Sequence, residues 1–452
     1  MKEKFMDIQL PPSVALILNT LTCNNYKAYI VGGCVRDSLL GKSPKDWDIT
    51  TSALPHQIMK LFNKTIPTGL KHGTVTVVIN NEHFEVTTFR IESTYSDNRH
   101  PDQVFFTSNI EEDLSRRDFT INAMAYNKSE SLVDIFHGQK DLNTKIIRCV
   151  GNPSERFNED ALRMIRAIRF STQLSFHLDE ATTSSIILNN SLIKNISMER
   201  IRDELCKILM CSEPSIGIRL LQHTGLLKYI LPELNKCVGF QQHNPHHHLD
   251  VFEHTMLVLD TTPEDLIIRL AALFHDVAKP KCFTMDENGN GHFYMHEVES
   301  SIDAEKILKR LRFDNNTIKR VCILIKEHMQ GNNSLKTSSI KRLIARVGTE
   351  NLNSLFELKI ADIKAHMPPH TFDIVYDLRE KAAKIISEQQ PLNIKDLAID
   401  GTDLINIGIP KGKTIGIILN NLLDAVIENP HLNNRSILLN QALNTYSEIK
   451  KD

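Results

Sequence analysis

The chain has 452 residues, of which 41% are hydrophobic and 24% charged, which is typical of a globular protein with about three domains. A formal net charge of −2 excludes recognition of nucleic acid through overall charge, so local basic patches would have to supply it. Eight cysteines without a C-x-x-C pair exclude a zinc ribbon or a disulfide framework and predict a cytoplasmic protein. No run reaches the roughly 18 apolar residues of a membrane span, so we expect no membrane partner.

A glycine turn is the first informative feature after a helix predicted over residues 1–25. An apolar run ends in Gly32-Gly33, and a helix-like segment follows. Asp46 and Asp48 come next, and in a strand their spacing would point both carboxylates to one face. Paired carboxylates beside a glycine turn suit Mg²⁺ and a triphosphate, whereas a solvated turn with two exposed aspartates is the alternative.

Two β-type runs, 73–79 and 83–89, predict a hairpin whose turn is Asn80-Asn81. Glu85 lies in the second run and is the natural third carboxylate for the aspartate pair. A charged side chain inside a buried strand needs a partner or a metal. An edge-strand glutamate that faces water is the alternative. The sequence therefore indicates a centre of three carboxylates.

Two polar segments follow the hairpin. Residues 90–101 are turn-rich, and we expect a mobile loop there. Further on, Arg116 and Arg117 precede Asp118 and a segment of small residues that predicts a helix. A helix start disfavours extra positive charge but favours an anion, so a phosphate would fit between the arginines.

From about residue 151 nearly every segment is helical in pattern. Asp160, Arg163, Arg166 and Arg169 recur at every third residue and predict one polar ridge. An aspartate can accept from an exocyclic amine while an arginine donates to the neighbouring ring nitrogen. Cytosine and adenine carry that amine, so the first pair could admit CTP and ATP and reject GTP and UTP, at roughly 1–3 kcal/mol per bidentate contact. A solvated basic face is the alternative.

The region after residue 240 is rich in histidine. An apolar helix ends in adjacent histidine and aspartate, with another histidine before it and an aspartate far after it. Imidazole and carboxylate together suit Mn²⁺, Ni²⁺, Mg²⁺ or Zn²⁺. The predicted metal ligands are His254, His275, Asp276 and Asp362. His296 and His328 also lie within or beside helical patterns, whereas a solvated loop is expected for His246–His248.

Together these motifs resemble those of bacterial class II tRNA nucleotidyltransferases, the CCA-adding enzymes of the DNA polymerase beta superfamily, along nearly the whole chain. The family's Gly-Gly-x-x-Arg-Asp and Asp-x-Asp elements are matched by Gly32, Gly33, Arg36, Asp37, Asp46 and Asp48. Its Arg-Arg-Asp-Phe-Thr motif is matched by residues 116–120. Its Glu-Asp-x-x-Arg element is matched by Glu159, Asp160 and Arg163.

The resemblance implies roles for these residues. Asp46 and Asp48 would hold Mg²⁺, assisted by Glu85, as the catalytic group. The nucleotide would be contacted by Gly32, Gly33, Arg36, Arg117, Asp118, Glu159, Asp160, Arg163, Arg166 and Arg169.

The middle of the chain resembles an HD-type metal-dependent phosphohydrolase domain, whose ligand pattern His254, His275, Asp276 and Asp362 match. The resemblance implies a divalent transition metal or Mg²⁺ there, with phosphatase or cyclic phosphodiesterase activity. Some family members have lost such a domain. Residues 396–430 resemble the family's tail, which contacts the tRNA elbow.

We therefore expect an α+β protein whose small mixed α/β head of about five strands precedes helical parts. The predicted domains are a nucleotidyltransferase head at 1–150, a nucleotide-selecting neck at 151–240, an HD-type domain at 241–370 and a tRNA-binding tail at 371–452. The expected partners are tRNA, CTP and ATP. The sequence leaves the oligomeric state open, a homodimer included.

The expected activity is template-independent addition of C, C and A to the 3′ end of tRNA, with pyrophosphate released. A poly(A) polymerase shares the head, but the chain lacks the basic extension of that branch. A CC-adding enzyme is recognised by loss of the loop at 90–101, which is complete here, and an A-adding enzyme keeps it. A protein that acts chiefly as an HD-type phosphohydrolase is the alternative from another class.

Overall fold

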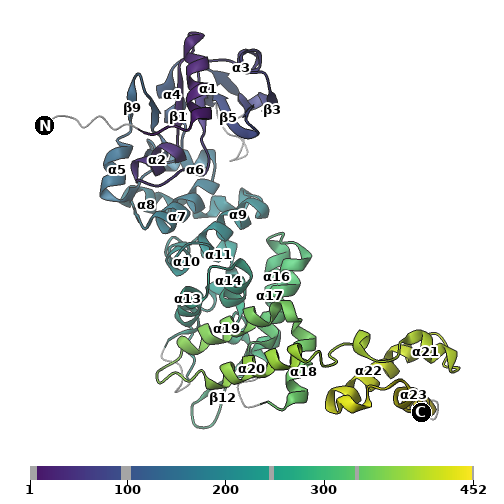
Figure 1. Ribbon diagram of the computed structural model, residues 1–452. Coiled ribbons are helices and arrows are strands. Elements are labelled where there is room, and N and C mark those ends of the chain that lie inside the picture. Colours follow the sequence, from purple (N-terminus) through teal and green to yellow (C-terminus); the bar gives the residue numbers. More distant parts are fainter. Residues whose placement is uncertain (1–7, 93–102, 244–248, 331–334, 450–452) are drawn as a thin grey trace. The chain divides into compact units, whose positions relative to one another are not determined.

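The structure is a computed structural model that describes residues 8–92, 103–243, 249–330 and 335–449 (Figure 1). The chain divides into two compact units, Met1–Pro232 and Glu233–Asp452. The first unit contains a sheet with helices and the second is mostly helical, which confirms the predicted α+β class. The four domains stay a prediction, because their boundaries at 150/151 and 370/371 fall inside the two units and not between them. Most of the loop 90–101 and the run 246–248 lie outside the described residues.

The sheet of the first unit has seven strands, not about five, in the order β3-β4-β5-β2-β1-β8-β9. β2 and β5 pair in parallel, and the other neighbours are antiparallel. The predicted hairpin is confirmed, because β4 and β5 pair across Asn80 and Asn81, whose positive φ asparagine tolerates. The strands are β1 Ala28–Val31, β2 Ile49–Thr51, β3 Thr65–Gly69, β4 Thr74–Ile79, β5 Glu82–Thr88, β8 Ala125–Asn127 and β9 Ser131–Val133.

Two local predictions are wrong. The first helix, α1, spans Pro12–Cys23 and not residues 1–25, since consecutive prolines lack the N–H of a helix interior and fit only its start. The helix predicted after Asp118 is a single 3₁₀ turn, Thr120–Asn122, followed by β8, which pairs with β1. A further short strand, β10, spans Ile146–Ile147.

The helices of the first unit cover the sheet and then continue beyond it. One core contains Tyr29 of β1, Phe89 and Leu114 of α4, and in this core α4 packs against the sheet. The helices are α2 Gly33–Leu39, α3 Pro55–Leu61, α4 Ile110–Ser115, α5 Gly138–Thr144, α6 Pro153–Glu159, α7 Leu162–Leu174, α8 Glu180–Asn189, α9 Met198–Leu209, α10 Pro214–His223 and α11 Leu227–Ile230. Short strand pairs join β6 Arg90–Glu92 to β7 Val104–Phe106, and β10 to β11 His177–Leu178.

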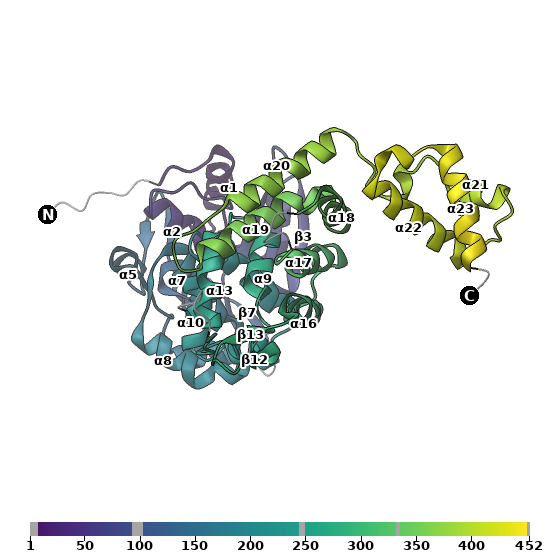
Figure 2. The ribbon, with the colours of Figure 1, turned by 90° about the horizontal axis from the view of Figure 1, so that it is seen from below.

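The second unit is built of helices with one short hairpin. In Figures 1 and 2, α19 and α20 lie side by side, and α21, α22 and α23 gather around their own core, which includes Leu404, Leu422 and Leu438. Among the described helices, none combines the length and apolarity of a bilayer crossing. The elements are α13 Val251–Thr261, α14 Leu266–Phe274, α15 Lys279–Cys282, β12 Phe283–Met285, β13 Gly291–Phe293, α16 His296–Arg310, α17 Asn315–Glu327, α18 Thr337–Val347, α19 Leu352–Lys364, α20 Asp373–Ser387, α21 Gly401–Asn406, α22 Lys413–Glu428 and α23 Arg435–Ile449, and α12 Pro232–Asn235 begins at the end of the first unit.

Candidate functional site

The turn after β1 places a helix start beside a guanidinium. Gly32 has a φ of 80°, and a Cβ there would lie 3.1 Å from Nη1 of Arg117, so the backbone angle and the close approach both favour glycine. Arg36 in α2 is buried, and its Nη1 donates to Asn122 Oδ1 at 2.7 Å. Its Nε donates to Asp37 Oδ1 at 2.8 Å. The turn therefore brings predicted residues from the glycine and arginine motifs together.

Asp46 and Asp48 lie in the loop just before β2, not inside a strand as their spacing predicted, because β2 begins at Ile49. The prediction that Glu85 joins them is supported by the register. β2 and β5 pair in parallel with Ile49 opposite Val86, so one step back Asp48 is level with Glu85. Glu85 lies on an internal strand, yet all three carboxylates are exposed. The centre is thus open to ligands.

These carboxylates act on one another. The pKa of Asp48 is raised, mainly because surrounding protein atoms displace water around its carboxyl group, although the side chain keeps contact with solvent. Arg117 lowers this pKa, whereas the charges of Glu85 and Asp46 raise it. A divalent cation would relieve the repulsion, and clustered carboxylate oxygens are the ligands that hard cations such as Mg²⁺ take. The donor set therefore fits a divalent metal.

Asp113 holds the two adjacent arginines in place, and sequence reasoning missed it. Its buried carboxylate accepts from Arg116 Nη2 at 2.7 Å and from Arg117 Nη2 at 3.3 Å. Burial alone would raise the pKa of Asp113, but the two guanidiniums hold it below its ordinary value. Nε of Arg117 is buried and has no hydrogen-bond partner among the described residues. Asp113 precedes Arg116 by three residues and Arg117 by four. This is the spacing at which side chains meet on a helix, and it could have indicated the pairing.

Asp118 links the arginine motif to α7. Its Oδ2 accepts from Arg166 Nε at 2.9 Å and from Arg166 Nη2 at 2.6 Å. Its Oδ1 accepts from Asn122 Nδ2 at 3.3 Å, so this amide joins Asp118 to Arg36. Burial alone would raise the pKa of Asp118, but Arg166 outweighs it and lowers the pKa to about 2. Asn122 was also missed, although it lies four residues after Asp118.

The predicted base-reading residues lie where α6 gives way to α7. The ridge predicted along one helix holds for the three arginines of α7 but not for Asp160, because the helix is broken at Asp160, whose backbone is extended. The side chains of Asp160 and Arg163 each contact a residue outside this pair. Arg200 of α9 donates to Asp160 Oδ2 at 2.7 Å, and Arg163 donates to Glu159 Oε2 at 2.6 Å. A base that uses the Asp160 carboxylate would therefore share it with Arg200.

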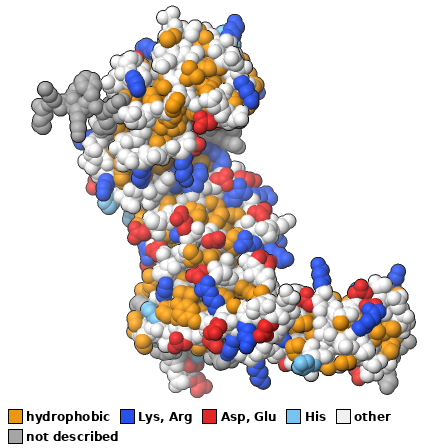
Figure 3. Space-filling model, in the orientation of Figure 1, with side chains coloured by type: hydrophobic (Ala, Val, Ile, Leu, Met, Phe, Trp, Pro, Cys, Tyr) orange, Lys and Arg blue, Asp and Glu red, His pale blue; other side chains and the backbone are white. Residues whose placement is uncertain are grey.

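Phe170 of α7 gathers three of the predicted arginines. The guanidinium carbons of Arg36, Arg166 and Arg169 lie 5.2, 5.5 and 3.8 Å from its ring centroid, within cation–π range. The aromatic face orders these cations without cancelling their charge. Arg169 also donates to Glu204 Oε2 at 2.5 Å. Figure 3 shows Lys and Arg side chains gathered over the region of α6 and α9, the local patch that the small net charge requires.

A second cluster of ligating side chains lies in the second unit, and all four predicted residues meet there. Asp276 Oδ2 lies 3.1 Å from His275 Nε2 and 3.6 Å from His254 Nε2. Asp362 Oδ1 lies 3.0 Å from His254 Nε2 and 3.7 Å from His275 Nε2. Neither oxygen of buried Asp276 accepts a well-directed hydrogen bond from a described residue. Imidazole nitrogens and carboxylate oxygens that converge in this way form a donor set that fits a divalent metal.

Asp276 is shared by two sets of ligand atoms. With His254 and His275 it forms one set, and with His296 and His328 another, each within 4.8 Å. The pKa of His328 is lowered to about 3, first by burial and then by the charge of His275, so its imidazole is neutral at pH 7, the form that binds metals.

Two further groups extend the cluster beyond the predicted ligands. Lys279 Nζ lies 2.7 Å from Asp276 Oδ2. His366 Nε2 lies 3.7 Å from Asp362 Oδ1. Sequence reasoning missed His366. This residue follows Asp362 by four residues, the spacing of one helical turn, and lies just after the carboxyl end of α19.

Known protein families match three stretches of the chain. The poly A polymerase head domain matches residues 28–148, which include the carboxylate centre and the arginine motif. The family described as "Probable RNA and SrmB- binding site of polymerase A" matches residues 175–237. The family described as tRNA nucleotidyltransferase domain 2 matches residues 293–442.

Relatives match over nearly the full length. The chain is 35% identical to a CCA-adding enzyme of Pediococcus pentosaceus over 440 residues, which is 96% of this chain and 97% of the relative. It is 35% identical to a CCA-adding enzyme of Ligilactobacillus salivarius over 427 residues, 94% of each. The Bacillus stearothermophilus CCA-adding enzyme in complex with CTP superposes with a TM-score of 0.72 at 28% identity, over 98% of this chain and 100% of that one. The Thermotoga maritima enzyme complexed with tRNA shares the fold, with a TM-score of 0.57 at 20% identity over 98% and 97%.

Proposed function

The chain belongs to the CCA-adding enzymes, a family of tRNA nucleotidyltransferases, and we propose that it adds C, C and A to the 3′ end of tRNA at the carboxylate centre of the first unit. The observation that carries this assignment is the convergence of Asp48, Glu85 and Arg117, with an unpaired Arg117 Nε beside the glycine turn. CTP and ATP are the proposed nucleotides, as in the relatives' complexes.

In the proposed reaction the 3′ hydroxyl of tRNA attacks the α-phosphorus of the nucleotide. A phosphodiester bond forms, the bond to pyrophosphate breaks, and the hydroxyl proton is released. Asp46 and Asp48 would hold Mg²⁺, assisted by Glu85. When bound, the metal supplies charge stabilisation for the attacking and leaving oxygens.

The arginines of the site bind and orient the triphosphate. Arg117 offers its guanidinium, whose side chain is 20% exposed, to a phosphate oxygen, while Asp113 keeps it in position. Arg166 is fixed by Asp118 and by the face of Phe170, and its order lowers the entropy cost of binding. Positive charge held ready for the developing charge of the phosphoryl group stabilises the transition state.

Asp160 and Arg163 are the proposed base-reading pair. They extend from the break between two helices, and Arg200 and Glu159 orient them when no base is present. The carboxylate accepts from the amine of cytosine or adenine, whereas guanine and uracil present an oxygen that it repels. One pair then serves both nucleotides of the CCA sequence.

The experiment that tests this function supplies tRNA ending before CCA, and in parallel tRNA ending in CC, with labelled CTP and ATP, separately and together, and sequences the products. We expect two C with CTP alone and CCA with both. Addition of A only to tRNA that already ends in CC would assign an A-adding enzyme, and a product that stops at CC would assign a CC-adding enzyme. Either result overturns the proposal.

A second activity is favoured by the shared carboxylate of Asp276 and its surrounding imidazoles. We propose an HD-type phosphohydrolase centre there, with a divalent transition metal or Mg²⁺ held by His254, His275, Asp276 and Asp362. Bound metal would supply Lewis-acid activation at a phosphoryl oxygen. A cavity of about 260 Å³ at the cluster is large enough for a phosphoryl group, and Lys279 and Tyr294 line it. Asp276→Ala tests it: metal-stimulated phosphate release is lost if the proposal holds and persists if it does not.

A further inference from the structure

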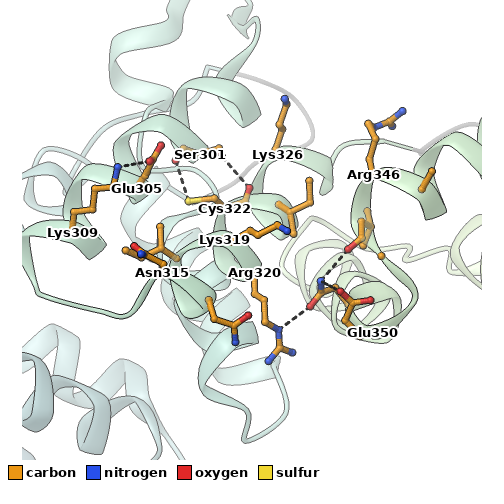
Figure 4. A pocket seen from close by; sticks show the side chains of 17 residues that line it. Ser301, Glu305, Lys309, Asn315, Lys319, Arg320, Cys322, Lys326, Arg346 and Glu350 are labelled. Atoms are coloured by element: carbon orange, nitrogen blue, oxygen red, sulfur yellow. Dashed lines mark hydrogen bonds and ion pairs between the residues drawn. The ribbon is translucent and has the colours of Figure 1, made fainter. Parts of the chain in front are cut away.

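A groove of about 900 Å³ lies in the second unit, away from the second cluster, among α16, α17, α18 and the 3₁₀ turn Thr349–Asn351. Figure 4 shows its lining side chains. Five of them are cationic and two are carboxylates. The cations are Lys309, Lys319, Arg320, Lys326 and Arg346, and the carboxylates are Glu305 and Glu350.

Two of the guanidiniums are held in place by hydrogen bonds to buried side chains. Arg346 donates from Nε and Nη2 to the two carboxylate oxygens of buried Glu327, both at 2.8 Å. Arg320 Nε donates to Oδ1 of buried Asn351 at 2.8 Å. Side chains fixed in this way lose little freedom when an anion binds to their remaining N–H groups. The groove therefore has a prepared cationic floor.

Two lysines add charge that no described group neutralises. Lys319 and Lys326 lie on the exposed face of α17, seven residues and about 10 Å apart along the helix axis. Within the described part of the chain, the ammonium group of neither lysine makes an ion pair or a hydrogen bond. Lys309, by contrast, pairs with Glu305 at 2.5 Å. The free positive charge of the groove thus lies along one helix, whereas Glu350 contributes a carboxylate to the lining.

The kind of ligand follows from what the groove offers. The amides of Asn315 and Asn316 line it beside the cations, and amides bind both phosphate oxygens and ribose hydroxyls. None of the described lining residues is aromatic, so no ring is available for a base to stack on. This composition suits a sugar–phosphate backbone better than a free nucleotide or an unpaired base.

We propose that this groove binds the ribose–phosphate backbone of the tRNA substrate, with Lys319 and Lys326 as direct phosphate contacts. The proposal rests on tRNA being the substrate. Because the chain carries a net charge of only −2, local clusters of this kind must supply its affinity for RNA. The contacts are to backbone and not to base edges, so the groove strengthens binding independently of sequence.

The test compares the full-length protein with the double variant K319E/K326E. Binding of CCA-lacking tRNA is measured at several salt concentrations, with KM values for tRNA and for CTP. Loss of two phosphate contacts weakens tRNA binding by roughly 10- to 50-fold near 0.1 M salt and makes the slope of log K against log salt shallower by about 1.5. The KM for CTP stays within two-fold, since the nucleotide site lies in the other unit.

The matched control is K60E/K64E in the first unit, which makes the same charge change at two exposed lysines that neither line the groove nor lie in the predicted tail. We expect it to bind tRNA as the wild type does. The neutral variant K319Q/K326Q should show a smaller loss of the same kind, and thermal unfolding verifies that each variant is folded. Unchanged tRNA affinity and salt slope in K319E/K326E would overturn the inference.

Equal losses in K319E/K326E and in the control would also overturn it, because they indicate only an overall charge effect. ATP binding in the groove, abolished in K319E/K326E while tRNA affinity is kept, would assign a nucleotide site instead. Failure of the proposed function is visible separately, as wild-type protein that binds tRNA but adds no nucleotide.

Discussion

Removal of the Asp118 charge tests the electrostatic account of the nucleotide site. The pKa of this carboxyl is about 2, below its ordinary value of 3.8, because Arg166 outweighs the effect of burial. The difference of about 1.8 units corresponds to roughly 2.4 kcal/mol at 1.36 kcal/mol per unit. The Asp118 side chain is only 11% exposed, so solvent screening reduces this little. We expect Asp118→Asn to lower the free energy of unfolding of the first unit by about 2 kcal/mol at pH 7.

The sign of the pH dependence follows from the lowered pKa. The folded state holds the proton less tightly than the unfolded state, so the stabilisation is complete above about pH 5 and is lost as the pH falls through 3.8 towards 2. About half of it should be gone at pH 3. The difference between wild type and Asp118→Asn should therefore shrink from pH 7 to pH 3.

Trp47 makes the assay specific, because it is the one tryptophan of the chain and lies between the two catalytic aspartates. Urea unfolding followed by its fluorescence reports on the first unit. Asp203→Asn is the control, since this aspartate is 57% exposed and pairs with Arg202, and we expect a change below about 0.5 kcal/mol. A change that small for Asp118→Asn, or a loss that is the same at pH 7 and pH 3, refutes the reasoning.

Three further predictions concern the two centres. Asp160→Ala should relax the preference for CTP over UTP by roughly 5- to 150-fold in kcat/KM, the kinetic equivalent of one bidentate contact, and retained selectivity would exclude Asp160 as the base reader. Glu85→Gln should lower kcat for CMP addition by at least about 10-fold while the KM for tRNA stays, since it removes charge only at the metal. Asp276→Asn should abolish Mn²⁺ binding to the second unit in calorimetry; heat equal to that of wild type speaks against the cluster as a metal site.

The sequence predicted local structure correctly where the chemistry of single residues decides the backbone conformation. Asn80 and Asn81 tolerate positive φ, and the hairpin that they predict is present. The small residues after Asp118 were read as a helix, but Ala125 is buried and pairs with β1, so tertiary packing overrides helix propensity. β2 is only three residues long, which left Asp48 in a loop although its register with Glu85 is as expected.

The sequence did not predict which side chains of distant elements pair with each other. The motif spacing identified Asp160, but its partner Arg200 lies 40 residues later, on a helix whose position depends on packing. Arg166 was predicted to contact the nucleotide, and nothing in the local sequence shows that Asp118 holds it. His254, His275 and Asp362 were predicted as ligands from the histidine and aspartate pattern and its resemblance to an HD-type domain, while their arrangement around Asp276 depends on how distant helices pack.

The most direct measurement of the central claim is single-turnover addition of CMP to tRNA that ends before CCA, by wild type, Asp48→Ala and Asp276→Ala at equal protein concentration. The account predicts that wild type and Asp276→Ala extend the tRNA at the same rate, whereas Asp48→Ala extends it at least about 100-fold more slowly, since it loses a metal ligand of the reacting centre. Normal extension by Asp48→Ala would contradict the assignment of the carboxylate centre as the site of nucleotide addition.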